Sequence, residues 1–437
     1  MRLRARSDPN LTKQDGAAKA APFACNAVPR CLIFCEDRFR PVPMLAQTIY
    51  HWIIVGSLLL ILANILANLR VFDGLRPAEP PENPPHVSIL VPARNEDRSI
   101  EACVGSLLRQ DYPDCEVIVL DDHSDDATGA IVERLFADAI QVRPNLIVRL
   151  VRGQPLPDGW TGKNWACHQL SQAARGEFLF FTDADTEHAP GTVTAAVAYA
   201  QKNRAGLVSA WPRLLTNTPG EKLIVPVIVL IGLAFCPLWL QQWIQRKPER
   251  AKGHDVRGLG VANGQFMFFS RRAYTRIGGH GAVRAHVVED VTLGREIAAL
   301  MPEGERLFNC EALEFSTVRM YRSFAETWEG FTKNMRAVFD DRGMMFWLFG
   351  CFQAACFFWP FIAIFFAPAP LRWVVGLQIA LIFFIRFLLA ARFRTSWFGA
   401  LLHPLGLLLM MLIGVNSWRL SHGRGVVWKG RTYKPEI

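Results

Sequence analysis

Residues 176–185 read Gly-Glu-Phe-Leu-Phe-Phe-Thr-Asp-Ala-Asp, a short apolar run with strand character that stops at two carboxylates. In an extended segment, residues two positions apart point the same way, so Asp183 and Asp185 can face one divalent cation, a hard ion that prefers oxygen ligands. An Asp-x-Asp pattern alone is weak evidence, because it also occurs by chance in polar loops. Its position at the end of a buried strand favours a metal site that would neutralise a diphosphate.

Two further strands precede this one. Residues 86–92 (His-Val-Ser-Ile-Leu-Val-Pro) are rich in β-branched residues and predict a strand, and residues 98–110 after them have helical spacing. Residues 115–120 (Cys-Glu-Val-Ile-Val-Leu) predict a second strand, and residues 127–136 again have helical character. Strand, helix, strand, helix in this order predicts an α/β domain with a parallel sheet. Open parallel sheets bind ligands at the carboxyl ends of their strands, where the polar clusters of this sequence also fall.

Short polar blocks at these strand ends carry a family resemblance. They are Val-Pro-Ala-Arg-Asn-Glu at 91–96, Leu-Asp-Asp-His-Ser-Asp-Asp at 120–126, Trp-Thr-Gly-Lys at 160–163, Thr-Asp-Ala-Asp at 182–185 and Val-Glu-Asp at 288–290. Their order and spacing across about residues 86–340 resemble a family 2 glycosyltransferase. The resemblance implies the GT-A fold of nucleotide-diphospho-sugar transferases, and transfer of a sugar from such a donor with inversion at the anomeric carbon.

The resemblance also implies a donor site. In this site, a carboxylate would lie near the base or ribose of the nucleoside, and a lysine would lie beside the diphosphate. The Asp-x-Asp pair would hold Mg²⁺ or Mn²⁺. Turn residues are the alternative interpretation of the first block. The implied donor-binding residues are Pro92, Ala93, Glu96, Asp121, Asp122, Lys163 and Asp183, and the implied metal ligands are Asp183 and Asp185.

The resemblance places the catalytic base at Asp290, with Glu289 as the next candidate. Inversion needs a single carboxylate that takes the proton from the attacking hydroxyl. Asp290 could instead be the N-cap of the helix that follows it. On the acceptor side the resemblance implies Asn263, Gly264, Gln265, Arg319 and Arg322.

One departure from the family pattern concerns the acceptor. Sugar polymerases of the family carry a Gln-x-x-Arg-Trp block, and the nearest match, residues 319–323, keeps an arginine but lacks both Gln and Trp. Residues 328–334 and 428–433 (Trp-Lys-Gly-Arg-Thr-Tyr) are similar to membrane glycosyltransferases that act on lipids, such as the carotenoid (diaponeurosporenoate) and hopene-associated glycosyltransferases. We therefore expect a lipid acceptor. A processive polysaccharide synthase and a non-catalytic membrane scaffold or transporter are the alternatives.

Apolar runs predict membrane segments on both sides of the 86–340 domain. A transmembrane helix is expected over 48–68, transmembrane or interfacial helices over 345–418, and a re-entrant or interfacial segment over 223–240. The segment over 223–240 is not expected to span the membrane, because a full span would place Asp183 and Asp290 on opposite sides of the bilayer. We expect an integral protein of the cell (inner) membrane with its catalytic domain in the cytoplasm, where nucleotide sugars are found.

Charge and cysteine content exclude other classes. The formal net charge is +9, but the basic residues flank apolar runs, as in the tail over 419–437, so no nucleic-acid partner is expected. The ten cysteines include no Cys-x-x-Cys pair, which argues against a structural zinc or a disulfide framework. Residues 1–47 are predicted to be a disordered or mis-assigned N-terminal tail. Arg386 falls inside an apolar run; snorkelling to a nearby surface is the favoured interpretation, with a functional role as the alternative.

Overall fold

The computed structural model describes residues 44–339, 342–423, 425–428 and 431–433. The chain divides into residues 1–47 and residues 48–437, and only the start of one helix is described in the first part. The predicted tail over 1–47 therefore lies outside the described residues except for 44–47, which are helical. The predicted basic tail over 419–437 is described in part.

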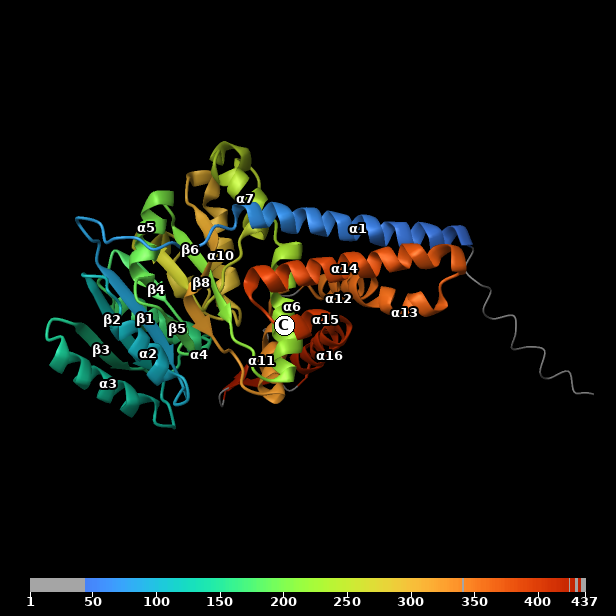
Figure 1. The fold of residues 1–437 in the computed structure, drawn as a ribbon. Helices are drawn as coiled ribbons and strands as arrows, with labels where there is room; N and C mark the ends of the chain where they lie inside the picture. Colours follow the sequence, from blue (N-terminus) through green and yellow to red (C-terminus); the bar gives the residue numbers. More distant parts are fainter. Residues whose placement is uncertain (1–43, 340–341, 424, 429–430, 434–437) are drawn as a thin grey trace, which may run out of the picture. The chain divides into compact units, whose positions relative to one another are not determined.

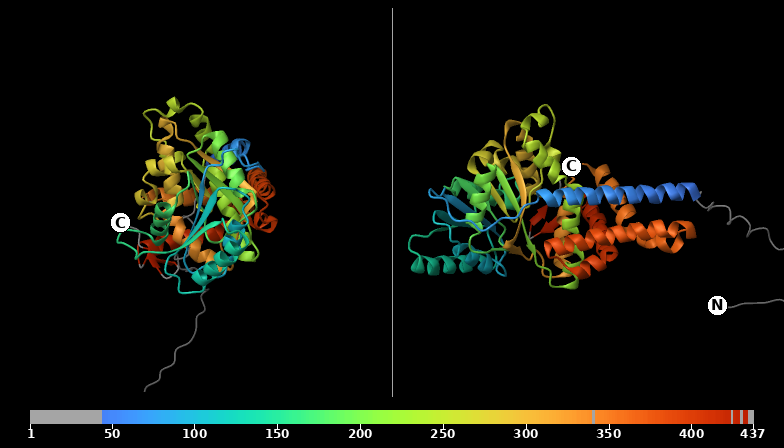
Figure 2. Two further views of the ribbon diagram at one scale, coloured as in Figure 1. Left: turned by 90° about the vertical axis from the view of Figure 1, so that its left-hand side faces the viewer. Right: turned by 45° about the horizontal axis from the view of Figure 1, so that its top comes forward.

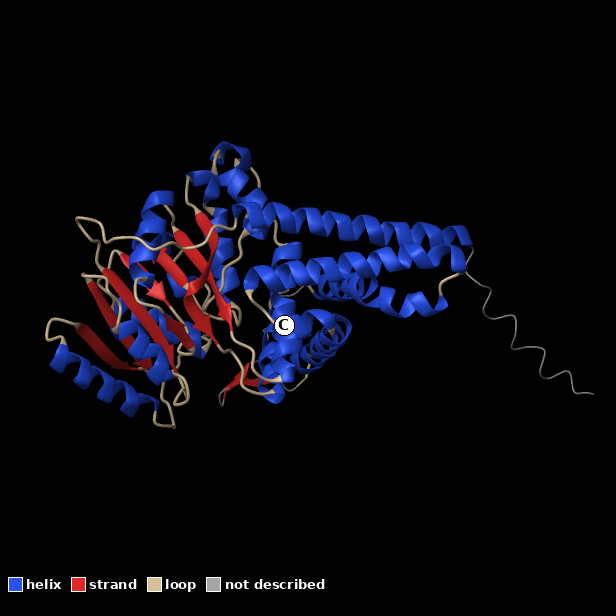
Figure 3. Ribbon diagram, in the orientation of Figure 1, coloured by secondary structure: helices blue, strands red, loops and turns tan. Residues whose placement is uncertain are grey.

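The sheet has eight strands in the order β3-β2-β1-β4-β7-β6-β8-β5, and Figure 3 shows them in red. The first two strands and the one before Asp183 are short apolar runs, as the sequence predicts. The strands are β1 Val87–Ala93, β2 Cys115–Asp121, β3 Ile147–Arg152, β4 Phe178–Phe181, β5 Thr186–His188, β6 Leu207–Leu214, β7 Met267–Ser270 and β8 Leu307–Val318.

The sheet is mixed, so the prediction of a parallel sheet is correct only for part of it. Strands β3, β2, β1 and β4 run parallel to one another in that spatial order, and β6 runs parallel to β8. Strand β7 lies antiparallel to both β4 and β6, and β5 lies antiparallel to β8. The physical reason is that β7 returns beside β4 after a long excursion of the chain, and no local pattern in β7 records the direction of that return. The α/β fold class is confirmed.

Helices cover both faces of this sheet because its strands are apolar on both sides (Figure 1). Ile89 and Val91 of β1 face a core shared with α2, α3 and α5, whereas Leu90 faces the core shared with α4, α8 and α10. These helices are α2 Ile100–Leu108, α3 Thr128–Val142, α5 Thr192–Asn203, α4 Gly162–Ala173, α8 Arg271–Arg276 and α10 Glu289–Ala299, with a short α9, Gly279–Ala282.

Within the described residues, four helical segments are long and apolar enough to cross a membrane. They are Met44–Val71, Gly343–Phe366, Ala369–Phe393 and His403–Ser421. The elements are α1 Met44–Val71, α12 Gly343–Gln353 with α13 Trp359–Phe366, α14 Arg372–Phe393, and α16 His403–Ser421 after the short α15 Trp397–Leu401. Helices α1 and α14 lie side by side (Figures 1 and 2), and Gln378 of α14 donates to the His51 carbonyl of α1 at 2.7 Å.

The apolar segment within the domain is broken. It forms α6 Pro219–Phe235 and α7 Leu238–Gln245, which meet at an angle of 45°. The carbonyls freed at the break are satisfied by α1, because Asn68 donates to Leu233 O at 2.9 Å and to Cys236 O at 2.7 Å. A bend of this kind is found both in broken membrane spans and in re-entrant segments, so the re-entrant or interfacial path stays a prediction.

Arg386 of α14 is held inside this helical part. Its side chain is only 2% exposed and donates to the Pro226 carbonyl of α6 at 3.1 Å. The snorkelling interpretation is therefore wrong: a backbone acceptor within reach makes a path to the surface unnecessary. Arg386 joins α14 to the proline-containing turn of α6.

Two elements near the end of the chain complete the described structure. Helix α11, Phe324–Ala337, packs against α16 and α6. Strands β9 Val426–Trp428 and β10 Arg431–Tyr433 pair antiparallel as a small hairpin, which packs against α11.

Candidate functional site

A cavity of about 800 Å³ opens where β1, β2 and β4 end. Most of the site residues expected from the sequence line it, although they come from segments up to about two hundred residues apart. Those residues are Pro92, Ala93, Glu96, Asp122, Lys163, Asp183, Asp185, Asn263, Gly264, Gln265, Glu289 and Asp290.

Lys163 stands at the centre of the charged groups. It lies in the first turn of α4, and its Nζ is 2.7 Å from Asp183 Oδ1 and 2.8 Å from Glu289 Oε1. Burial by itself would lower the pKa of Lys163, but the carboxylates of Asp183 and Glu289 raise that pKa well above its ordinary value. Lys163 is therefore a permanent positive charge beside the end of β4.

Asp290 is fixed by two backbone groups. Its Oδ2 accepts a hydrogen bond from Gly264 N at 2.8 Å, and its Oδ1 accepts from Val291 N at 2.8 Å. Burial, followed by the nearby Glu289 carboxylate, raises the pKa of Asp290 to about 6. A carboxylate with such a pKa is ionised at neutral pH and is suited to accept a proton.

The N-cap alternative for Asp290 is wrong. Helix α10 begins at Glu289 with Val288 as the N-cap residue, so Asp290 lies within the first helical turn. Glu289 is 4% exposed and turned to Lys163, whereas Asp290 faces the Gly264 turn. The two neighbouring carboxylates thus have separate partners.

Asp183 and Asp185 follow β4 on a short loop before β5, and Thr186 Oγ1 lies 3.3 Å from Asp185 Oδ1. In the ranges that the structure describes, no group of three or more His, Cys, Asp or Glu side chains could hold a metal ion by itself. A pair of carboxylates that line one cavity nevertheless fits Mg²⁺ or Mn²⁺, since such ions take one or two carboxylates and complete their shell with water and substrate phosphates.

A buried hydrogen-bond network, which the sequence did not predict, holds the loop that carries Asp183 and Asp185. Thr182 Oγ1 donates to Gln265 O at 3.0 Å and lies 2.8 Å from His188 Nε2, while His188 Nδ1 lies 2.8 Å from Ser316 Oγ. Burial lowers the pKa of His188 to about 3, so its ring is neutral. The network ties the loop after β4 to the turn that contacts Asp290.

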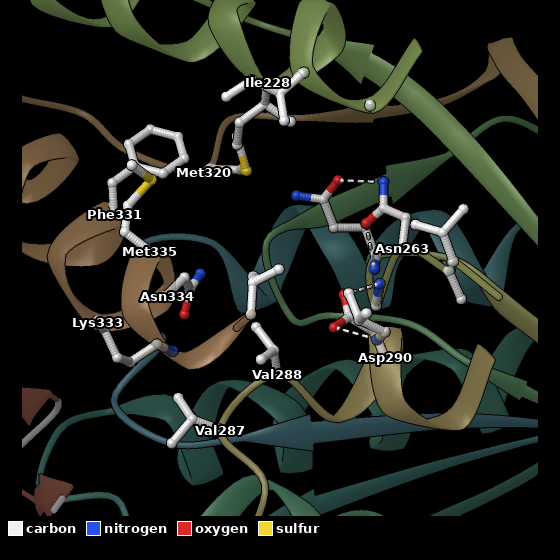
Figure 4. Close-up of a pocket in the computed structure, with 18 of the residues that line it drawn as sticks. Ile228, Asn263, Val287, Val288, Asp290, Met320, Phe331, Lys333, Asn334 and Met335 are labelled. Carbon is white, nitrogen blue, oxygen red and sulfur yellow. Dashed lines mark hydrogen bonds between the residues drawn. The ribbon is translucent and has the colours of Figure 1, made fainter. Parts of the chain in front are cut away.

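The same cavity continues into an apolar chamber. Figure 4 shows Asp290 and Asn263 on one side, and Ile228, Met320, Phe331 and Met335 around the other. The apolar lining comes from α6, α11, α12 and α16: Ile228, Val229, Gly232, Phe235, Phe331, Met335, Phe346, Phe349, Met410, Met411 and Val415. Charged groups and apolar helices therefore share one space.

Comparison with known proteins assigns the domain. Residues 88–275 match the family described as "Glycosyl transferase family 2". The chain contains a family 2 glycosyltransferase domain. A 4,4'-diaponeurosporenoate glycosyltransferase of Staphylococcus aureus (strain USA300) is 26% identical to this glycosyltransferase over 364 residues, which is 79% of this chain and 88% of that protein.

Solved structures with some likeness include the mannosyltransferase PcManGT of Pyrobaculum calidifontis in complex with GDP-Man and Mn²⁺, at 20% identity and a TM-score of 0.46 over 86% of this chain and 96% of that one. Another is Staphylococcus aureus TarS 1-349 in complex with UDP-GlcNAc, at 16% identity and a TM-score of 0.37 over 77% of this chain and 90% of that one.

Three predicted site residues of the glycosyltransferase lie outside the cavity lining. Asp121 pairs with Arg152 and accepts from Ser124 N, Arg319 donates to both carboxylate oxygens of Glu221, and Arg322 donates to the Arg98 carbonyl. In place of facing a ligand, Asp121 joins β2 to β3. Arg319 anchors the start of α6, because Glu221 lies in the first turn of that helix.

Asp122 has a partner that the sequence interpretation missed. Arg431 of β10 donates to both oxygens of the Asp122 carboxylate, from a position 309 residues further along the chain. Each of the adjacent carboxylates at 121 and 122 thus has its own arginine, which relieves their repulsion. The resemblance of residues 428–433 to other membrane enzymes was a signal, but it did not indicate where the tail would lie.

Proposed function

We propose that this glycosyltransferase moves one sugar from a nucleotide diphosphate sugar to the polar end of a membrane lipid, with inversion at the anomeric carbon. The observation that supports this proposal is the single cavity, in which Asp290 and Asp183 share a space with the apolar side chains of α6, α11, α12 and α16. A lipid can enter such a cavity with its chain among apolar groups and its hydroxyl near the carboxylates.

The donor binds at the ends of β1, β2 and β4. Pro92, Ala93 and Glu96 line the nucleoside side with Asp122, and Lys163 contributes positive charge to the diphosphate. Asp183 and Asp185 would hold Mg²⁺ or Mn²⁺, which stabilises negative charge on the leaving diphosphate. The pairing of Lys163 with Asp183 keeps both groups in place before the donor arrives.

Asp290 acts as the base. It removes the proton of the acceptor hydroxyl as that oxygen bonds to the anomeric carbon, and the bond from this carbon to the diphosphate oxygen breaks on the opposite face. The two N–H groups from Gly264 and Val291 orient the carboxylate during this transfer. Glu289 would hold the ammonium group of Lys163 in position through their ion pair.

The acceptor reaches Asp290 from the bilayer. The bent pair of α6 and α7 would form a shallow element beside the cavity. An acceptor chain that stays among apolar groups avoids a cost of about 0.8 kcal/mol per CH₂ exposed to water. The helices over 44–71 and 343–421 hold the enzyme in the inner membrane. The catalytic domain faces the cytoplasm, where the donor is made.

The test uses the purified full-length protein in detergent with membrane lipid extract and labelled UDP- and GDP-linked sugars. The expected product is a lipid carrying one added sugar, seen by thin-layer chromatography and mass spectrometry, in a reaction that chelation of divalent metal stops. A polymeric product would identify a processive synthase. Donor hydrolysis with no sugar on any lipid would contradict a lipid acceptor.

A further inference from the structure

The C-terminal hairpin places an arginine in the donor part of the cavity. Arg431 lines the same cavity as Lys163 and Asp183, although it belongs to β10, beyond the last apolar helix. Its Nη2 donates to Asp122 Oδ1 at 3.0 Å and its Nη1 donates to Asp122 Oδ2, a two-point pairing that fixes the plane of the guanidinium. The Asp122 side chain is 5% exposed and that of Arg431 is 19% exposed.

The start of α4 is shaped to receive this guanidinium. A Cβ atom on residue 162 would collide with Arg431 Nη1 and lie 3.2 Å from Asp122 Oδ2, so a larger residue would displace the Arg431 guanidinium from this position. Gly162 is followed directly by Lys163, whose Nζ contacts Asp183. Arg431 is therefore seated next to the lysine that stands beside the proposed metal ligands.

The charges in this region point to a diphosphate. Lys163 contacts the carboxylates of Asp183 and Glu289, and Arg431 is paired with the carboxylate of Asp122. A guanidinium carries five N–H donors in a planar fork, so one edge can hold a carboxylate while another edge holds phosphate oxygens. Two other arginines of the lining donate to backbone carbonyls, Arg94 to those of Asp122 and His123 and Arg295 to that of Val338. Lys333 of α11 also lines the cavity.

We infer that Arg431 is a donor-binding residue, which Asp122 and Gly162 position and which binds the diphosphate of the nucleotide sugar together with Lys163. This inference rests on the proposed function, because it assumes a nucleotide donor in this cavity. It adds that the donor site is incomplete without the C-terminal hairpin. Residues 92–185 and Arg431, which lie far apart in the sequence, then form one binding site.

The test measures binding of UDP and GDP, and of uridine and guanosine, to the full-length protein in detergent by calorimetry with Mn²⁺ present. Arg431→Gln should weaken binding of the preferred nucleoside diphosphate by about tenfold or more and leave nucleoside binding unchanged, because the lost contact is with phosphate. The affinity of Arg431→Lys for the nucleoside diphosphate should lie between those of wild type and Arg431→Gln, since lysine keeps the charge but lacks the planar guanidinium. Gly162→Ala should also weaken binding of the nucleoside diphosphate, because the added methyl group displaces Arg431 without removing any charge.

Arg419→Gln is the matched control, because Arg419 is an exposed arginine at the end of α16 outside the cavity lining. Thermal unfolding of each variant checks the fold. If wild type binds the diphosphate and Arg431→Gln binds it equally well, Arg431 has only a structural role and the inference is wrong. Tighter binding by Arg431→Gln would show that the tail competes with the donor. If wild type binds none of the nucleotides, the proposed function fails and the inference with it.

Discussion

Asp290 and Glu289 are adjacent carboxylates with different surroundings, and this difference assigns their roles. Asp290→Asn should lower turnover by roughly a hundredfold or more while nucleoside diphosphate affinity stays near that of wild type, because the amide keeps the shape but cannot accept the proton. Steady-state kinetics and calorimetry measure the two effects. Asp138→Asn, at an exposed position of α3, is the control. If Asp290→Asn turned over at the wild-type rate, another residue would be the base, and Glu289 would be the first candidate.

The pKa of Asp290 also predicts how the rate depends on pH. The active base is the ionised form, and burial raises its pKa to about 6, so protonation inactivates the enzyme as the pH falls through that value. We expect kcat/KM to be level above about pH 7 and to fall by about tenfold per pH unit below pH 6. The pH–rate profile of wild type with a saturating metal concentration checks this. A profile that stays level down to pH 5 would contradict the assignment.

The carboxylates after β4 should control metal-dependent donor binding. Asp183→Ala and Asp185→Ala should each weaken Mn²⁺-dependent binding of the nucleoside diphosphate and nearly abolish transfer, because the charge of the diphosphate is no longer compensated. Calorimetry with and without Mn²⁺ separates the metal contribution, and Asp138→Ala serves as the control. Unchanged metal-dependent binding in both variants would place the metal elsewhere.

At the scale of elements, α1 stabilises the break between α6 and α7. Asn68 is fully buried; it donates to two carbonyls of the break and accepts from Trp239 N. Asn68→Ala leaves these backbone groups without partners, so we expect a loss of stability of about 2–4 kcal/mol and a lower thermal unfolding temperature in detergent. Asn145→Ala, on an exposed loop, should have no such effect. An equal unfolding temperature for Asn68→Ala and wild type would show that the break needs no support from α1.

At the scale of the whole molecule, the cavity couples the sheet domain to the apolar helices. Ile228 of α6 is 37% exposed and lines the chamber across from Asp290 (Figure 4). Ile228→Asp should impair transfer to lipid far more than hydrolysis of the donor by water, because a charge in the chamber opposes entry of the acceptor chain and leaves the donor site intact. Both rates are measured on one preparation, with Ile228→Leu as the apolar control. Equal loss of both activities would mean that α6 has no part in acceptor entry.

Much of the catalytic half could be predicted because its signals are local. Each of β1, β2 and β4 is an apolar run that ends directly at its polar residues, so Pro92, Asp122 and Asp183 were expected at one edge of the sheet and line one cavity. Asp290 was expected from the resemblance to the family pattern, and a segment over 223–240 that does not span the membrane was expected from the need to keep Asp183 and Asp290 on one side.

The sequence by itself thus determined the α/β class, the carboxylates at the strand ends and the apolar helices, because strand and helix periodicity and membrane-length runs depend on neighbouring residues. Only the tertiary structure decided the direction of β7, the pairing of Arg319 with Glu221, and the junction of the charged and apolar parts of the cavity. It also decided the contacts of Asn68 with Leu233 and of Asp122 with Arg431, which join residues 165 and 309 positions apart. Such contacts depend on how distant segments pack, and no short-range pattern in either segment specifies its partner.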